Sequence, residues 1–315
     1  MTGPVAVVVV SYFSADDLGG CLAALKGEEV VGPVVVIDNA STDDSVAVAR
    51  KAGGEQVKVV ALDENTGFAG GCNRGYALVQ DQAEYVAFMN PDVRVEEACF
   101  ERCVAVMEAN PRVGCVAPLL MRPDGVTVDS AGQVLKRGTL EVQDRGYGEA
   151  LGPEWSKPGP VLAACGALAV FRREALVSVM EEGGPWAEGF FCFWEDLELG
   201  WRLNNAGWEV WFEPLARAEH GRGAGAASGT GPLRWRRPPE LEACIITNRW
   251  MTLVRHLHGL DLMWRAPVLL AWDCALVVAG VLRRPSLACH LVKRWPLVWR
   301  EMRGRGRRSR KRLSC

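Results

Sequence analysis

Two adjacent carboxylates, Glu195 and Asp196, are the side chains in this 315-residue chain best placed to take a proton from another molecule. They follow an aromatic run at residues 189–194, and a helical pattern begins directly behind them. The pair is therefore predicted at a helix N-terminus beside apolar bulk, where a carboxylate can serve as a general base. Helix capping is the simpler interpretation, because acidic residues are common in first turns. The rest of the chain decides between these two interpretations.

Four predicted strands each end in polar residues. Residues 5–10, 34–38, 57–62 and 85–89 are apolar runs of strand length, and helical patterns separate them. Strands that alternate with helices predict a parallel α/β sheet with helices on both faces. Ligands of such sheets bind at the carboxyl ends of the strands. The residues at or just beyond those ends are Ser11, Asp38, Asn65 and Asp92.

The second half of the chain has a looser pattern. We expect a helix at 96–110, strands at 113–118 and 208–212, and surface hairpins or loops at 122–155. The small residues of 163–171 predict a strand that another group can approach closely. Residues 219–239 are expected to form a loop, and 240–258 a helix. We therefore predict one domain at 1–239 and a helical C-terminal region at 240–315.

Composition indicates a cytosolic globular protein. The hydrophobic fraction of 49% is ample for a core. The eleven cysteines are scattered without metal-site spacing, which predicts reduced and mostly buried thiols. The apolar run at 5–10 is too short for a signal peptide and no basic residue precedes it.

The C-terminal region is strongly basic although the net charge is only −2. From Arg283 onward there are twelve Lys and Arg residues against one acid, Glu301. An apolar helix is expected at 267–282, which is shorter than the ~20 residues needed to cross a bilayer, so we expect it to be buried or to lie in the membrane plane. Nearby tryptophans interleave with basic residues, a mixture suited to an anionic membrane surface. A core helix with a solvated basic tail explains the pattern equally well, and nucleic acid is the less favoured polyanion.

Six motifs occur in an order that resembles a known family. They are VVVVSYFSADDL, VVVIDNASTDDS, ENTGFAGGCNRG, FMNPDV, GFFCFWEDLELGWRL and EHGRG, and together they span residues 5–223. Each motif is weak by itself, but the ordered set is specific. The chain resembles the family-2 glycosyltransferases with the A-type fold, and within them the rhamnosyltransferase-like branch.

The resemblance implies a mostly parallel, Rossmann-like sheet flanked by helices, with a helical C-terminal appendage. It also implies an inverting transfer of a sugar from a nucleoside diphosphate to an acceptor hydroxyl, with Mg²⁺ or Mn²⁺ as cofactor. The expected donor is dTDP-rhamnose, and the expected acceptor is a glycan of the cell wall or one linked to polyprenyl diphosphate. Such an enzyme is expected in the cytoplasm, peripherally bound to the inner face of the cell membrane.

The resemblance also assigns roles to individual residues. Asp196 matches the general base and Glu195 orients the acceptor, although the two could exchange roles. Asp92 is the expected metal ligand, with Asn90 in place of the first acid of the metal motif, and His220 meets the metal or the diphosphate. The expected donor-binding residues are Ser11, Tyr12, Asp38, Asn65, Gly67, Phe68, Asn73, Arg74, Asn90 and Arg222.

The sequence departs from the family pattern at two places. Phe13 stands where the family often has Asn, which puts the base-binding loop in doubt. The segment 223–239 matches no family pattern, and we expect it to be a flexible lid.

Three other functions are alternatives to a glycosyltransferase. A dinucleotide-dependent oxidoreductase is disfavoured because the GFAGG loop follows the third predicted strand and not the first. A nucleotidyltransferase is disfavoured because no glycine-rich basic loop follows residues 5–10. A non-catalytic protein that binds nucleotide sugars or glycans with the same fold stays open.

Overall fold

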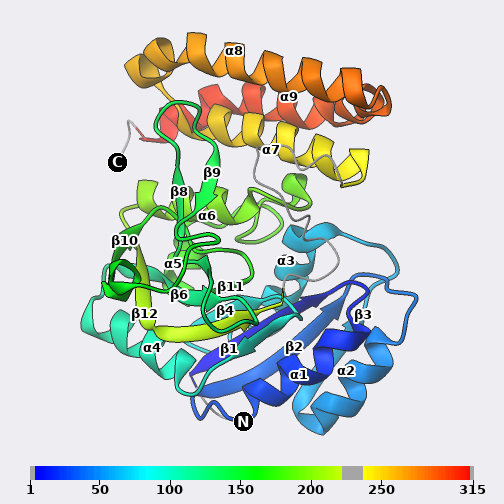
Figure 1. Cartoon of the computed structure of the whole chain (residues 1–315), viewed down its shortest axis with the longest axis vertical. Coiled ribbons are helices and arrows are strands. Elements are labelled where there is room, and N and C mark those ends of the chain that lie inside the picture. Colours follow the sequence, from blue (N-terminus) through cyan, green and yellow to red (C-terminus); the bar gives the residue numbers. More distant parts are fainter. Residues whose placement is uncertain (1–3, 222–236, 313–315) are drawn as a thin grey trace. The chain divides into compact units, whose positions relative to one another are not determined.

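The computed structural model describes residues 4–221 and 237–312. The chain forms two compact units. Figure 1 labels their helices and strands. The sheet unit comprises Met1–Val134, Gln143–Phe191 and Glu195–Gly223, and the helical unit comprises Leu135–Val142, Cys192–Trp194 and Ala224–Cys315. The predicted division at 239–240 falls at the start of helix α7 (Pro239–His256). Two short excursions of the chain, at 135–142 and 192–194, also belong to the helical unit.

The first half of the sheet unit contains the four parallel strands predicted from the sequence. Their order in the sheet is β3-β2-β1-β4, with every neighbouring pair parallel. Every residue of the valine-rich first strand is buried, because helices cover both faces of the sheet. The strands are β1 (Val5–Ser11), β2 (Val31–Asp38), β3 (Val57–Ala61) and β4 (Tyr85–Met89).

Beyond β4 the sheet becomes mixed. Strand β11 (Leu168–Arg172) runs antiparallel to β4 and to β6 (Val113–Met121). Strand β12 (Glu209–His220) is parallel to β6 and continues well past residue 212, where we expected it to end. Three short strands complete the sheet: β10 (Gly159–Val161) and β5 (Val93–Val95) pair with β12, and β7 (Val128–Ser130) pairs with β6.

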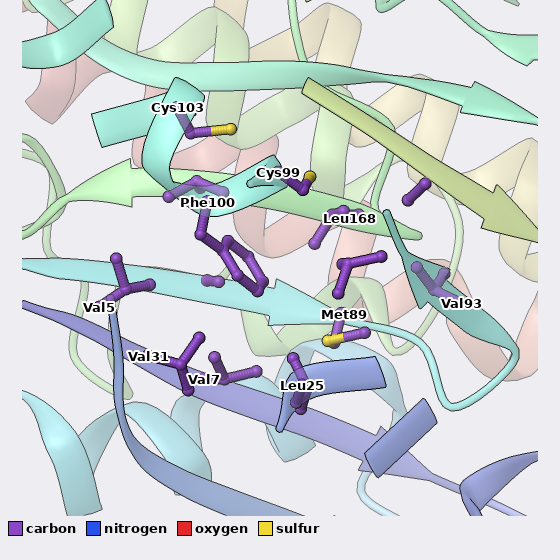
Figure 2. Close-up of a cluster of buried hydrophobic side chains, with 14 of the residues drawn as sticks. Val5, Val7, Leu25, Val31, Met89, Val93, Cys99, Phe100, Cys103 and Leu168 are labelled. Carbon is purple, nitrogen blue, oxygen red and sulfur yellow. The ribbon is translucent and has the colours of Figure 1, made fainter. Parts of the chain in front are cut away.

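Helices from different parts of the chain cover the two faces of the sheet. Helices α1 (Ala15–Leu25), α2 (Ser45–Gly53) and α4 (Cys99–Ala109) pack on one face. Figure 2 shows this core, with Phe100 of α4 and Leu25 of α1 lying over Val7 and Met89 of the sheet. The other face carries α3 (Gly67–Val79), α5 (Arg173–Ser178) and α6 (Glu195–Asn205).

The surface hairpins expected at 122–155 are short elements. They include β7, the pair β8 (Gln133–Leu135) and β9 (Val142–Asp144), and the 3₁₀ turn η2 (Pro153–Ser156). Two further 3₁₀ turns, η1 (Gly54–Gln56) and η3 (Glu188–Phe190), precede β3 and follow α5. The ten described cysteines are free thiols and six of them are buried, as predicted.

The helical unit contains α7, α8 (Gly259–Arg283) and α9 (Ser286–Arg312) around a small apolar core. Its centre is formed by Ala243, Ile246 and Leu287, with Leu276 of α8 packed against them. Helix α8 has 25 residues, more than our expectation for this segment, because it begins before Pro267. Only Leu269 and Gly280 of this fully described helix are buried, so the buried alternative for it was wrong.

Close packing explains part of the glycine content of α3. A Cβ at Gly75 would overlap the side chain of Val8 on the buried strand β1. Gly19 of α1, by contrast, has open space where a Cβ would lie. The two glycines therefore differ in what an added methyl group would meet.

We expect Gly75→Ala to lower the free energy of unfolding by about 1–3 kcal/mol, because Val8 has no room to move. The matched change Gly19→Ala should raise it by about 0.5–1 kcal/mol through higher helix propensity. Urea denaturation followed by circular dichroism measures both. Equal effects of the two substitutions would contradict the packing role of Gly75.

Candidate active site

Asp38 is a buried acid at the carboxyl end of β2. Its Oδ1 accepts hydrogen bonds from the hydroxyls of Ser11, at 3.2 Å, and Ser41, at 2.7 Å. Its Oδ2 accepts the Ser41 backbone N–H at 2.8 Å. The carboxylate is thus fixed in place by neutral donors at the predicted edge of the sheet.

The loop after β1 presents two aromatic rings. Tyr12 and Phe13 are both about half exposed, with ring centroids 4.6 Å apart in an edge-to-face arrangement. Phe13 has a left-handed backbone with φ of 50°, and its N–H donates to the Ser41 hydroxyl at 2.9 Å. Asn adopts this conformation more readily than Phe. The departure at position 13 therefore changes the side chain but keeps a backbone shape that suits Asn.

The glycine-rich loop is held by two asparagines. The Asn65 side chain accepts the Gly67 N–H at 2.8 Å. Asn39, which we did not predict, donates to the Gly67 carbonyl and accepts two hydrogen bonds from Thr66. Gly67 has φ of 75°, and a Cβ there would overlap the Phe191 carbonyl, so only glycine fits.

The neighbours Asn73 and Arg74 of α3 lie in different environments. Asn73 is buried, and its amide both donates to and accepts from the Trp186 backbone, at 2.8 and 2.9 Å. Trp186 in turn packs edge-to-face on Phe68, with centroids 5.5 Å apart. Asn73 thus fixes the backbone of Trp186, whose ring packs against Phe68. Arg74, in contrast, is exposed.

Asp92 and His220 meet because of strand pairing. Strand β5 pairs antiparallel with β12, which places Val93 opposite His220. The Nε2 atom of His220 lies 3.5 Å from Oδ1 of Asp92, and its Nδ1 lies 2.8 Å from Oδ2 of Asp129. Asp129 is fully buried on β7, inside a segment that we expected to be surface hairpins or loops. The buried acid in this Val-Asp-Ser strand was missed because three residues give little periodicity to detect.

The two acids set the charge of His220. Burial by itself would lower the pKa of His220, but the hydrogen bonds and charges of Asp129 and Asp92 outweigh it and raise that pKa to about 9. An imidazole between two carboxylates is protonated at neutral pH when no metal competes for Nε2.

These residues fit a hard divalent cation. Among the described residues, no group of three or more His, Cys, Asp and Glu side chains is arranged to hold a metal ion. Asp92 and Nε2 of His220 are the two groups that could ligate such an ion, and the Asp129 carboxylate lies 2.8 Å from Nδ1 on the other side of the imidazole. Mg²⁺ and similar ions often take few protein ligands and complete their shell with water and phosphate oxygens. Asn90, two residues before Asp92, lies partly exposed after β4 and donates its N–H to the Ala167 carbonyl.

Asp196 lies in the first turn of α6, as predicted. Its Oδ2 accepts from Gln133 Nε2 at 2.8 Å and from the Gly166 N–H at 2.9 Å, and its Oδ1 accepts the Leu197 N–H at 2.8 Å. Burial raises the pKa of Asp196, and these three donors oppose the rise. A Cβ added to Gly166 would lie 3.3 Å from Oδ2 of Asp196. The Asp196 side chain is therefore the group that approaches the small residues of 163–171 closely. Gln133 was not predicted, because it lies 63 residues away in a short strand.

Glu195 and Glu198 differ from Asp196 in accessibility. Both glutamates are buried, whereas Asp196 keeps part of its surface exposed. Glu198 pairs at 2.9 Å with Arg202, which lies one helical turn further along α6. Of the two adjacent acids, Asp196 is therefore the one that another molecule can reach.

The segment just before these acids belongs to the helical unit. Phe193 and Trp194 have left-handed φ values of 68° and 72°. The Asn248 side chain on α7 donates to the carbonyls of Cys192 and Phe193, at 2.8 and 2.7 Å. Arg294 of α9 in turn donates to the Asn248 side-chain oxygen at 2.7 Å. These contacts hold a segment whose backbone would otherwise be strained.

Arg249, the next residue of α7, holds the hairpin tip of the same unit. It donates to the carbonyls of Thr139 and Leu140, and Leu140 also has a left-handed φ of 52°. Adjacent residues of one helix therefore support two irregular segments. The predicted donor residue Arg222, and most of the predicted lid, lie outside the described residues.

Comparison with known proteins identifies the family. A family model described as glycosyl transferase family 2 matches residues 6–179. This chain is a family-2 glycosyltransferase. The prediction from the ordered motifs is confirmed.

Similarity extends beyond the matched domain of this glycosyltransferase. It is 29% identical to N-acetylglucosaminyl-diphospho-decaprenol L-rhamnosyltransferase of Mycobacterium tuberculosis, over 90% of this chain and 96% of that protein. A shorter stretch, 24% of the chain, is 37% identical to the succinoglycan biosynthesis protein ExoU of Rhizobium meliloti.

Two solved structures share the fold of the glycosyltransferase. GalNAc-T7 with UDP, GalNAc and Mn²⁺ has a TM-score of 0.58 at 16% identity, covering 80% of this chain and 48% of that one. The mannosyltransferase PcManGT of Pyrobaculum calidifontis, in complex with GDP-Man and Mn²⁺, has a TM-score of 0.52 at 16% identity, covering 93% and 86%. These likenesses confirm the predicted A-type fold.

The raised pKa of His220 predicts how stability depends on pH in the metal-free enzyme. The folded pKa of about 9 lies above the ordinary 6.5, so the stabilisation is fully present below pH 6.5 and is lost as pH rises through 9. Asp129→Asn should cost on the order of 2 kcal/mol at neutral pH and flatten this dependence. Denaturation in EDTA across this pH range measures the free energy of unfolding, and Asp63→Asn, at an exposed position, is the control variant. An unchanged pH dependence in Asp129→Asn would contradict the assignment.

Proposed function

We propose that this protein is an inverting rhamnosyltransferase that moves rhamnose from dTDP-rhamnose to a hydroxyl of a polyprenyl-diphosphate-linked glycan. The observation that carries the proposal is similarity over nearly the whole chain to a relative whose name states that reaction class. The local geometry at Asp196 and Asp92 supports it.

In this proposal Asp196 is the general base. Its two oxygens are fixed by Gln133, Gly166 and Leu197, so the carboxylate is oriented before the acceptor arrives. It would take the proton of the acceptor hydroxyl as that oxygen attacks the anomeric carbon from the face opposite the diphosphate. A single displacement inverts the centre through a transition state with oxocarbenium character. Glu195 is buried, so this proposal gives the contact with the acceptor to Asp196 alone.

Donor binding is proposed for the polar residues at the sheet edge. Asp38 would accept hydrogen bonds from the base or ribose, while Ser11 and Tyr12 line the base loop. Asn65, Gly67 and Phe68 would cover the nucleotide, and Asn73 supports them from below through Trp186. Exposed Arg74, with Asn90 and Arg222, would neutralise or steady the diphosphate.

Asp92 and His220 would hold the Mg²⁺ or Mn²⁺ ion. A bound divalent cation neutralises the charge that develops on a diphosphate leaving group. We place the enzyme in the cytoplasm at the inner membrane face, because a polyprenyl-linked acceptor is anchored in the bilayer.

The donor is identified with a panel of nucleotide sugars. We expect dTDP-rhamnose with Mn²⁺ to raise the melting temperature and to release dTDP slowly, and EDTA to abolish both effects. Asp196→Asn should keep the thermal shift and lose about 10²–10⁴-fold in release. Absence of any shift with every donor would favour the non-catalytic binding protein.

The environment of Asp196 predicts a pH profile. Since burial raises its pKa and a base must be ionised, activity should fall on the acid side at a pH above the ordinary Asp value of 3.8. Gln133→Leu removes a donor to the ionised form, so it should raise the pKa further and lower acid-side activity roughly tenfold. The alkaline plateau should stay unchanged. A uniform loss at all pH values would instead indicate a structural role for Gln133.

Metal binding is tested at Asp92. Asp92→Asn should weaken Mn²⁺-dependent stabilisation by donor at least roughly tenfold, because a neutral amide is a poorer ligand for a hard cation. The matched control Asp63→Asn should bind donor and Mn²⁺ like the wild type. Isothermal titration of Mn²⁺ with dTDP present measures the affinity, and wild-type affinity in Asp92→Asn would refute the assignment.

A further inference from the structure

Helix α8 exposes an apolar face that the proposed reaction does not use. It is the one helix in the described part of the chain that is long and apolar enough to cross a membrane, yet only 11% of its most apolar stretch is buried. The exposed side chains recur every three or four residues and so form one stripe along the helix. They are Leu260, Met263, Trp264, Pro267, Val268, Leu270, Ala271, Cys274, Ala275, Val278, Ala279 and Leu282.

The charges of α8 lie at its ends. Between Arg265 and Arg283 the only charged residue is Asp273. Its carboxylate is turned into the unit, where it pairs with Arg249 at 2.7 Å. At the N-terminal end the guanidinium of Arg265 lies 4.2 Å from the ring centroid of Trp264. An exposed indole stacked on a cation at the border of an apolar stripe suits the headgroup level of a bilayer.

Helix α9 adds positive charge to the same unit. Lys293, Arg300 and Arg303 are exposed, and Arg303 lies 5.1 Å from the ring of the exposed Trp299. The one acid from Arg283 onward, Glu301, is buried in a pair with Arg255 at 2.9 Å. Local acids therefore do not offset this positive charge, which is complementary to anionic lipid headgroups.

An apolar hollow lies beside the stripe. It has a volume of about 490 Å³, and its lining includes Pro267, Val268, Trp272 and Thr139 of the hairpin tip. Exposed apolar surface that is both extended and concave is costly in water and can be filled by lipid tails.

From these observations we propose that α8 is a membrane-docking helix that lies in the plane of an anionic bilayer with its apolar stripe inserted. The proposal rests on the proposed function, since it explains how the enzyme meets a lipid-linked acceptor.

The contacts of α8 favour an in-plane position over a spanning one. Crossing the bilayer would separate Asp273 from Arg249 and leave an unpaired acid in hydrocarbon. It would also withdraw Leu276 and Val277 from the core that they share with α7 and α9. A second copy is a poorer occupant, because Lys293, Arg300 and Arg303 would gather around a twofold axis.

Vesicle flotation of the full chain tests the proposal. We expect it to float with phosphatidylcholine vesicles that contain phosphatidylglycerol, and much less with phosphatidylcholine alone. The double variant Val268→Glu/Val278→Glu should bind at least roughly tenfold more weakly. The matched control Val126→Glu/Val177→Glu changes valines of similar exposure in the sheet unit and should float like the wild type. The exposed fractions are 51% for Val268 and 56% for Val278, against 62% for Val126 and 53% for Val177.

Further outcomes distinguish the alternatives. Cys274, in the stripe, should react more slowly with a water-soluble maleimide when vesicles are present, and alkaline carbonate should release the protein. Resistance to carbonate would overturn the in-plane position in favour of a spanning helix. A wild-type dimer that the α8 variant dissociates, with no flotation, would overturn membrane docking in favour of self-association. Binding to RNA in place of vesicles would overturn it in favour of nucleic acid.

Release of dTDP from dTDP-rhamnose separates this proposal from the proposed function. The α8 variant should retain wild-type release in solution and an unchanged melting temperature, because its substitutions lie on an exposed face. If the α8 variant loses flotation but still releases dTDP, membrane docking by α8 is supported. If the wild type floats but releases no nucleotide from any donor, only the proposed transferase function is refuted.

Discussion

The pairing of β12 with β5 and β6 is the constraint on which the proposed metal site depends. It places His220 opposite Val93, one residue after Asp92, and β7 on the far side of β6 contributes Asp129. Three residues separated by 37 and 91 positions in the chain meet because ladder hydrogen bonds fix the register of these strands. A shift by one residue would turn His220 to the opposite face of the sheet.

Five acids of the described residues fall into two groups according to their partners. Glu198, Asp273 and Glu301 each pair with an arginine, which neutralises them and makes them structural. Asp38 and Asp196 accept hydrogen bonds from hydroxyls, a side-chain amide and backbone N–H groups. Such donors stabilise a carboxylate without cancelling its charge, so it can still act on a ligand. This difference in partners supports the proposed roles of Asp38 and Asp196 more directly than the presence of a carboxylate alone does.

The parts that sequence predicted are those with local signals. Apolar runs of strand length predicted β1 to β4, and polar residues after them located Ser11, Asp38 and Asp92 at one sheet edge. Gln133, Asp129 and Asn39 were missed because their roles come from long-range contacts or short strands that have no periodicity. The sequence predicts too short an α8 because proline favours a helix start, whereas Pro267 lies inside the helix, where a proline is possible if the lost hydrogen bond is tolerated.

The hold of Asn248 on residues 192–194 has a consequence for how the enzyme is made. A ribosome delivers Glu195 and Asp196 before it delivers Asn248, and Arg294 comes later still. The sheet unit can begin to fold as it emerges, since domains generally fold from the N-terminus during synthesis. The segment at 192–194, however, gains its hydrogen-bond partners only when α7 and α9 exist. The left-handed backbone that directly precedes the two acids therefore takes its final conformation only after the last helix of the chain has been made.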